Sequence, residues 1–148
     1  YKDFDKTNGG FGKSRKFPNA TTLDTMLDLY SLHHDKRLYL MINKTLTSMA
    51  YGGIYDHIEG GFFRYTVDRT YHTPHFEKML YTQAELLKVY SKAYLLLHNK
   101  LYSKIADELV EVVDKRFKDK NLFYGASDAD SINEDGEKEE GYFFLFSY

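Results

Sequence analysis

The fold is decided by one stretch, which reads Gly60-Gly-Phe-Phe-Arg-Tyr-Thr-Val-Asp-Arg-Thr-Tyr-His-Thr-Pro-His-Phe-Glu-Lys-Met-Leu-Tyr-Thr-Gln-Ala84. Its first part alternates in character. Phe63, Tyr65 and Val67 would point to one side of a strand, and the polar residues between them to the other. A period of two is typical of β-structure, so this part predicts a short β-hairpin that closes near residues 68–69.

The second part of the stretch predicts the start of a helix. Thr73 is expected to cap it, with Pro74 as the first helical residue, where the missing N–H of proline does no harm. The first turn would then present His75, Glu77 and Lys78 beneath the glycine-rich loop. Such a helix N-terminus can hold an anionic or polyhydroxyl ligand. A well-capped helix with surface charges explains the same spacing, and both interpretations stay open.

Four amphipathic helices are expected along the chain. Apolar residues recur at helical spacing from residue 21 or 22 to about 30, from 37 to 51, from 74 to 97 and from 101 to 117. Short connections join the first helix to the second and the third to the fourth, so the helices form two αα-hairpins. The expected fold class is therefore all-α with a small β-hairpin. The acidic run 133–140 is expected to be mobile.

Two polar positions in the apolar pattern leave alternatives open. Gln83 is the one strongly polar residue on the apolar stripe of the third helix. A buried amide either holds neighbouring backbone or faces a polar cavity. Asp56 and His57 form either an oriented histidine base or, more commonly for such a pair, a satisfied structural contact.

The composition excludes several classes of function. A formal net charge of −2 gives no electrostatic reason to expect binding to nucleic acid or to an anionic membrane. The absence of cysteine excludes disulfides, thiolate metal sites and thiol chemistry. No apolar run is long enough to cross a bilayer and no signal peptide is visible. We expect a cytoplasmic protein with no cofactor and no metal site.

Several blocks of sequence resemble the YyaL / spermatogenesis-associated protein family. They occur in the family's order, cover nearly the whole chain and are highly specific as a set. The blocks are Gly9-Gly10-Phe11-Gly12, Lys16-Phe17-Pro18, Gly52-Gly53-Ile54-Tyr55-Asp56-His57, Gly60-Gly61-Phe62-Phe63-Arg64-Tyr65, Pro74-His75-Phe76-Glu77-Lys78-Met79, Asp128-Ala129-Asp130-Ser131 and Glu140-Gly141-Tyr142-Phe143.

The resemblance implies a thioredoxin-like domain followed by an (α/α)6 toroid of the six-hairpin glycosidase type. Residues 1–148 would be the N-terminal part of that toroid, with two αα-hairpins present and with the thioredoxin-like domain and later hairpins absent. Both ends of the chain look cut.

A more distant resemblance, to N-acylglucosamine 2-epimerase, rests on residues 60–63, Asp68, Lys78, Tyr81 and Gln83. Here Tyr81 stands where that family has tryptophan and Glu85 where it has arginine. The acid and base histidines of that family lie on later hairpins.

These resemblances imply a carbohydrate-active domain, epimerase-, isomerase- or glycosidase-like, that takes a sugar or polyhydroxyl molecule. His75 or Glu77 would transfer protons, and Arg64 would bind a hydroxyl or carboxylate. The catalytic candidates are His75, Glu77, Asp128 and Asp130, and the substrate-binding candidates are Arg64, Tyr65, Lys78, Tyr81 and Gln83.

Structural roles would explain the same residues. Arg64 would pair with Asp68, Glu77 would support its helix, and the tandem aspartates would cap a turn. The alternative function is a non-catalytic scaffold or protein-binding module attached to a thioredoxin-like domain. In either case, a set of toroid hairpins without its neighbours would expose apolar faces, so self-association through those faces is expected.

Overall fold

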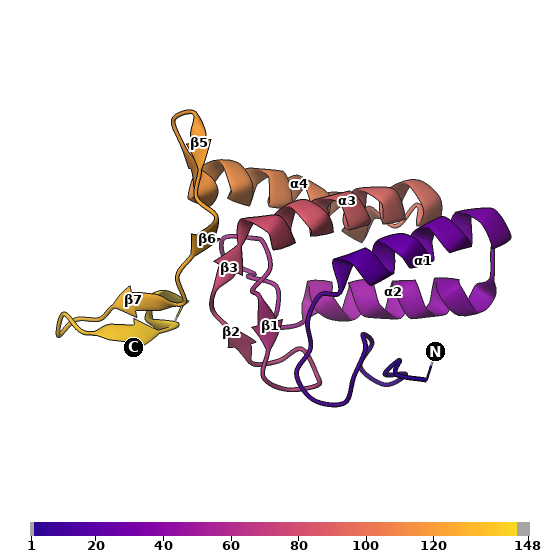
Figure 1. The fold of residues 1–148 in the computed structure, drawn as a ribbon, viewed down its shortest axis with the longest axis horizontal. Coiled ribbons are helices and arrows are strands. Elements are labelled where there is room, and N and C mark those ends of the chain that lie inside the picture. The colour runs from indigo at the N-terminus through magenta and orange to yellow at the C-terminus, as the bar shows by residue number, and fades with distance from the viewer. Residues whose placement is uncertain (1, 145–148) are drawn as a thin grey trace.

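The computed structural model describes residues 2–144 of the 148-residue chain. Its bulk is a bundle of four helices: α1 (Ala20–His33), α2 (Lys36–Tyr51), α3 (Leu80–Leu97) and α4 (Lys100–Val112). They form two hairpins, α1–α2 and α3–α4, which pack through α1 and α3. Figure 1 shows that both hairpin connections lie at one end of the helices and that the strands and loops gather at the other. The predicted pair of αα-hairpins is confirmed.

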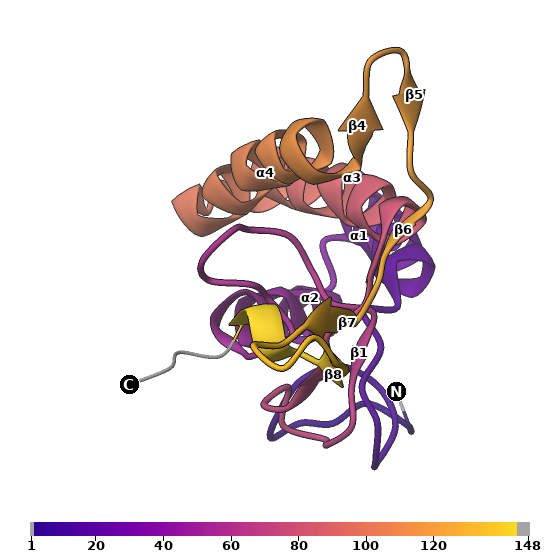
Figure 2. The same cartoon turned by 90° about the vertical axis from the view of Figure 1, so that its left-hand side faces the viewer.

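The strands are short and pair in four antiparallel ribbons. These are β1 (Tyr65–Thr66) with β2 (Pro74–His75), β3 (Lys78–Met79) with β6 (Ala126–Ser127), β4 (Lys118–Asp119) with β5 (Leu122–Phe123), and β7 (Asp130–Ile132) with β8 (Lys138–Glu140). In Figure 2 the β4–β5 ribbon projects away from the helices. The run 133–140 was expected to be mobile. In the structure it is the turn and second strand of the β7–β8 hairpin, whose turn is held by the side chain of Asn133.

The predicted start of the third helix is wrong. Residues 74–79 are extended and α3 begins at Leu80. Thr73 does not act as a cap, because its own N–H donates to the Asp68 carboxylate, which also accepts from the N–H groups of Thr70 and His72. The Asp68 side chain therefore organises the β1–β2 turn. Thr73 also precedes Pro74, and helical backbone is unfavourable for a residue before proline. The predicted hairpin is real but has a longer turn than expected.

Two other helix boundaries also differ from prediction. Asn19, in the left-handed conformation, precedes α1, so Thr21 and Thr22 lie inside the helix and neither is its cap. The fourth helix ends at Val112 and continues as a π-helical turn, η1 (Val113–Phe117). A 3₁₀ turn, η2 (Tyr142–Phe144), follows β8. Within residues 2–144 no helix is long and apolar enough to cross a membrane.

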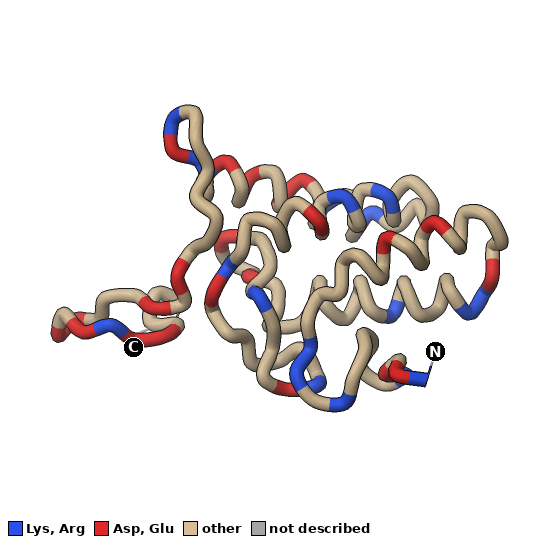
Figure 3. Tube along the Cα trace, viewed as in Figure 1, with Lys and Arg blue, Asp and Glu red and all other residues tan. Residues whose placement is uncertain are grey.

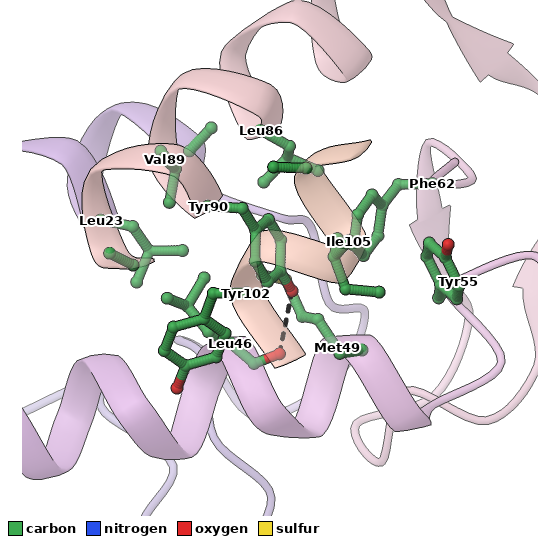
Figure 4. Packing of buried hydrophobic residues seen from close by; sticks show 14 of the residues in the cluster. Leu23, Leu46, Met49, Tyr55, Phe62, Leu86, Val89, Tyr90, Tyr102 and Ile105 are labelled. Carbon is green, nitrogen blue, oxygen red and sulfur yellow. Dashed lines mark hydrogen bonds between the residues drawn. The ribbon is translucent and has the colours of Figure 1, made fainter. Parts of the chain in front are cut away.

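The hydrophobic core lies between the two hairpins and is rich in aromatic side chains (Figure 4). Tyr90 is at its centre, fully buried, and donates its hydroxyl to the carbonyl of Leu46 at 2.9 Å. Phe62 stacks on the Tyr90 ring with a centroid distance of 5.5 Å. Tyr102 is also buried and donates to the Asn43 side chain at 2.7 Å. These tyrosines bury apolar rings because each hydroxyl finds an acceptor.

Two loops repeat one sequence pattern and one geometry. The first glycine loop (residues 4–11) and the second glycine loop (residues 55–62) both read aromatic-Asp-x-x-x-Gly-Gly-Phe. In each loop the first and last residues form a β-bridge, and the aspartate exchanges backbone hydrogen bonds with both glycines. All four glycines have φ between +70° and +83°. The first loop precedes α1 and the second precedes α3, so each hairpin begins with the same element.

A buried lysine closes each glycine loop. Lys16 Nζ lies 3.2 Å from the Asp5 carboxylate and 2.9 Å from the carbonyl of Gly9. Lys78 Nζ lies 2.6 Å from the Asp56 carboxylate and 2.9 Å from the carbonyl of Gly60. Both lysine side chains are almost completely buried. The pairing therefore satisfies a charge that would be costly to bury alone.

Candidate functional site

A row of three rings lies at the end of the bundle where α1 and α3 begin. Phe17 and Tyr65 lie 5.1 Å apart between ring centroids, and Tyr65 stacks on His75 at 4.9 Å with an interplanar angle of 23°. The guanidinium of Arg15 also lies over the Tyr65 ring, 5.5 Å from its centroid. The β1–β2 ribbon creates this row because Tyr65 and His75 are paired across it.

Charged groups line the row on one side. Arg64 donates to Glu77 at 2.8 Å, and His75 Nδ1 lies 2.6 Å from the carboxylate of Glu140. His75 Nε2 is 4.0 Å from Glu77 Oε2. The hydrogen bond and charge of Glu77 raise the pKa of Arg64 above its ordinary value. The guanidinium of Arg64 and the imidazole of His75 thus lie within 4.0 Å of one or both of the carboxylates of Glu77 and Glu140.

A small cavity of about 190 Å³ opens next to Arg64. Residues 17–22, at the start of α1, form one wall, and Tyr81, Thr82 and Glu85 of α3 form the other. Tyr81 is 53% exposed, so its ring is available to a ligand. The cavity mixes an aromatic face with a guanidinium and a carboxylate, which is the lining expected for a polar small molecule.

Four of the nine candidate residues from the sequence come together here, and a fifth borders the cavity. The four are Arg64, Tyr65, His75 and Glu77, and the fifth is Tyr81. The sequence predicted that a helix N-terminus would bring them together. In the structure the extended segment before α3 does so instead. The sequence found the residues through their types and spacing although the predicted local structure was different.

Lys78 and Gln83 face the interior instead. Lys78 closes the second glycine loop, and burial lowers its pKa while the Asp56 carboxylate opposes that shift. Gln83 accepts from the N–H of Phe62 at 2.8 Å and donates to the carbonyls of Phe62 and Met79. Of the two roles considered for Gln83, the structure shows the one that holds neighbouring backbone.

The two aspartate candidates lie on the exposed ribbon. Asp128 accepts weakly from the N–H of Asp130 and lies 3.9 Å from Lys138. Asp130 is opposite Glu140 in the β7–β8 pairing. Figure 3 shows that this hairpin carries mostly acidic residues. Within the described part of the chain, no group of three or more His, Asp and Glu side chains is arranged to hold a metal ion.

Two structural pairings expected from the sequence are wrong. Arg64 pairs with Glu77 and not with Asp68, whose carboxylate is taken by backbone N–H groups. Asp56 pairs with Lys78, and His57 instead lies 3.1 Å from the carbonyl of Gly52. In both cases the partner is distant in sequence, so a pattern of neighbouring residues could not identify it.

The sequence interpretation missed Glu140 as a site residue and missed the repeated glycine loops. The repeat could have been found by comparing the chain with itself, since two copies of an eight-residue pattern lie 51 positions apart in the printed sequence. Glu140 appeared in the sequence only as the first residue of the family-like block Glu140-Gly141-Tyr142-Phe143 and was given no role, because the acidic run before it is typical of a solvated loop.

A larger cavity lies elsewhere in the described part of the chain. It measures about 620 Å³ and lies between residues 55–60 and α4. Hydrogen bonds from Tyr55 to Glu108 and from Arg116 to Glu59 join residues on the two sides of this cavity. None of the candidate residues lines this cavity, and its lysine and arginine side chains each pair with a carboxylate of the same lining.

Comparison with known sequences gives a clear relationship. Spermatogenesis-associated protein 20 from Homo sapiens is 38% identical over 150 residues, which covers 97% of this chain and 19% of the human protein. The chain is homologous to spermatogenesis-associated protein 20. An uncharacterised Caenorhabditis elegans protein is 40% identical over 95% of the chain and 20% of its own length. The chain thus spans about a fifth of the length of these two relatives. No protein-family model matches it.

Comparison with solved structures identifies the fold. A sugar epimerase from a ruminal bacterium superposes with a TM-score of 0.78 at 19% identity, over 86% of this chain and 36% of the epimerase. Cellobiose 2-epimerase from Spirochaeta thermophila gives 0.76 at 17% identity, over 84% and 34%. A family 76 mannosidase from Bacteroides thetaiotaomicron gives 0.64 at 19%, over 85% and 34%. The two αα-hairpins of this chain have the fold of part of these six-hairpin sugar epimerases and glycoside hydrolases.

Proposed function

We propose that the chain forms one wall of a sugar-binding site in an (α/α)6 toroid domain. The share of the two epimerases that it matches, 34–36%, is what two hairpins of six would supply. On this proposal residues 1–148 are the N-terminal part of the toroid, and the longer relatives add the remaining hairpins and a thioredoxin-like domain. A cytoplasmic location belongs to the same proposal, and fractionation of cells that express the tagged protein tests it.

The observation that carries the proposal is the ring row beside the small cavity. Phe17 and Tyr81 present aromatic rings to the cavity, while Arg64 is 44% exposed at its side chain and has N–H donors beyond the one bound to Glu77. Sugar rings present apolar C–H faces and hydroxyl edges, so an aromatic face next to a guanidinium fits both. The reaction of the whole protein would be epimerisation, isomerisation or glycoside hydrolysis, with further groups from later hairpins.

Binding of cellobiose to the chain tests the proposal through its melting temperature. At ten times its dissociation constant a ligand adds about 1.4 kcal/mol of stability, which raises Tm by roughly 3 to 6 °C in a chain of this size. Tyr81→Ala should abolish the rise, because its ring borders the cavity. Tyr94→Ala, on the same helix but outside the cavity, should keep it. An equal rise in both variants would place the ligand elsewhere.

The alternative function is a non-catalytic scaffold or protein-binding module, and exposed leucines would give it a contact surface, although self-association through such a surface is expected under either function. Leu32 near the end of α1 and Leu95 near the end of α3 are 73% and 69% exposed. Leu32 and Leu95 are on helices that pack against each other, α1 and α3. A second copy of the chain that covered both leucines would give a concentration-dependent dimer. Analytical ultracentrifugation of the wild type and of Leu32→Lys/Leu95→Lys tests this. A wild type that stays monomeric at all concentrations contradicts self-association.

A further inference from the structure

Glu140 is held in place by the backbone around it. It is the last residue of β8. The next residue, Gly141, has φ +76° and donates its N–H to Ala129 at 2.9 Å. A Cβ atom on Gly141 would lie 2.5 Å from the ring of Phe76. Glycine is therefore required for the end of β8 to close against the segment that contains His75.

Aromatic packing fixes the same junction from the other side. Phe144 stacks on Phe76 with a centroid distance of 5.2 Å and an angle of 13°. The buried ring of Phe63 meets both of them edge to face, at 5.2 Å and 5.1 Å. The β7–β8 hairpin and the turn that follows it are thus docked on residues 63–76. This packing positions Glu140 next to His75.

The contacts of Glu140 determine which nitrogen of His75 carries a proton. Its Oε1 atom accepts from the backbone N–H of Phe76 at 3.3 Å and lies 2.6 Å from His75 Nδ1. A carboxylate can only accept, so Nδ1 must be the donor. In the neutral imidazole the other nitrogen, Nε2, then carries a free lone pair.

The geometry leaves Nε2 available to a ligand. Stacking on Tyr65 fixes the plane of the imidazole ring. Glu77 Oε2 is 4.0 Å from Nε2, beyond hydrogen-bond distance, and that carboxylate is engaged by Arg64. In residues 2–144 no hydrogen bond to His75 Nε2 is formed. A lone pair that is oriented by a carboxylate and left without a donor is the arrangement of a general base.

We propose that Glu140 is a positioning residue, which holds His75 in its Nδ1-protonated form so that Nε2 accepts the proton of a sugar hydroxyl. This inference rests on the proposed sugar site. In the proton transfer the O–H bond of the hydroxyl breaks and its electron pair stays on oxygen. The proton forms an N–H bond at Nε2, and the carboxylate of Glu140 offsets the positive charge of the imidazolium.

The protonation of the two ring nitrogens can be measured by ¹⁵N NMR of the labelled chain without ligand. The signals of His75 are assigned by their loss in His75→Asn. We expect a protonated Nδ1 and a bare Nε2 in the wild type. In Glu140→Gln the preference for this form should fall about tenfold, because a neutral amide accepts more weakly than a carboxylate. Glu139→Gln, the neighbouring residue with the same charge change, should leave the preference unchanged.

Specific outcomes overturn the inference. They are a proton on Nε2 in the wild type, or a Glu140→Gln variant with dispersed, native-like spectra and an unaltered preference. A ligand experiment separates this inference from the proposed function. Cellobiose should move the Nε2 signal in the wild type. If cellobiose raises Tm and Nε2 does not move, the positioning role fails and the sugar site stands. If cellobiose does not bind, the sugar site fails, and proton transfer from a sugar hydroxyl to His75 fails with it.

Discussion

The two glycine loops have the same sequence pattern and backbone but different charge balance. In the first loop, Asp5 binds two cations: Lys16, and Arg69 at 2.9 Å. In the second loop, Asp56 has only Lys78 as a cationic partner among the contacts of residues 2–144. Burial would raise the pKa of Asp5, but hydrogen bonds from Asn8, Arg69 and Lys16 outweigh it and hold this pKa well below its usual range. The first loop is therefore over-compensated and the second is balanced by a single pair.

The chain that follows each loop also differs. After the first loop, residues 12–19 lead directly into α1. After the second, residues 63–79 form β1, β2 and β3 before α3 begins, and this segment carries Arg64, Tyr65, His75 and Glu77. A glycine loop precedes the first helix of both hairpins, while the candidate site residues lie only on the longer connection, residues 63–79. Functional residues on a loop that a rigid element supports are a common arrangement.

Removing the buried lysines should lower the free energy of unfolding more than any other change to the glycine loops. Lys78→Met leaves Asp56 as an uncompensated buried charge, so the free energy of unfolding should fall by about 3–5 kcal/mol. Lys16→Met should cost about half as much, because Arg69 still compensates Asp5. Urea unfolding followed by circular dichroism measures both.

The control for these variants removes both charges of one pair. Asp56→Asn combined with Lys78→Met should recover more than half of the loss, since no charge then remains buried there. Equal losses in Lys16→Met and Lys78→Met would show that Arg69 contributes nothing to the first loop.

Alanine in the glycine loops should have the next largest effect. Gly10 has φ +70°, and a Cβ atom there would overlap the buried hydroxyl of Tyr71. Gly10→Ala should therefore cost about 3 kcal/mol, from backbone strain and overpacking together. Gly12→Ala, with φ +85° and open space around the new methyl group, should cost only the strain, about 1 kcal/mol.

The counterpart in the second loop sharpens this test. At Gly61 the nearest atoms to a Cβ would be Gln83 Oε1 and Val112 Cγ1, both at 3.0 Å. Gly61→Ala should fall between the other two variants in thermal unfolding. A Gly10→Ala variant as stable as Gly12→Ala would contradict the packing described around Tyr71.

The pH dependence of stability should show the smallest difference. The pKa of Asp5 is depressed in the folded state, so its contribution is fully present above the unfolded value of about 3.9 and is lost as pH falls through the folded value. Arg69→Met removes one cause of the depression. The fall in unfolding free energy from about pH 5 to pH 2 should then be shallower than in the wild type.

At neutral pH the same substitution should cost no more than about 1 kcal/mol, because the Arg69 side chain is half exposed. Urea unfolding at several pH values gives both quantities. Lys100→Met, at the start of α4, makes the same charge change away from Asp5 and should keep the wild-type slope. An unchanged slope in Arg69→Met would mean that Arg69 does not stabilise the Asp5 carboxylate.

The helices could be predicted from the sequence, because their apolar residues recur at a regular spacing. Period-3.6 patterns identified all four helices and their two hairpins, because an amphipathic stripe is a local property. The start of α3 was placed six residues too early, at Pro74 instead of Leu80. A proline after a threonine is typical of a helix start. Here the Asp68 carboxylate competes for the Thr73 N–H group, and strand pairing takes Pro74.

The site was predictable only in part, for a related reason. Arg64, His75 and Glu77 stand close in sequence, so their types and spacing indicated a cluster. Glu140 reaches His75 across 65 positions. That contact depends on packing between Gly141 and Phe76, which no local pattern encodes. Lys78 had the right residue type for a ligand, but its burial under the second glycine loop depends on Asp56, again a distant partner.

The π-helical turn at Val113–Phe117 holds one residue more than an α-helical turn would need. It brings Phe117 into the interior and lets Arg116 reach both Glu59 and Ser127. A shortening of the chain by one residue at this point would convert the turn to ordinary α-helix and rotate everything beyond it by about 100°. The register of the β3–β6 ribbon, and with it the approach of Glu140 to His75, therefore depends on the extra residue of the turn that ends α4.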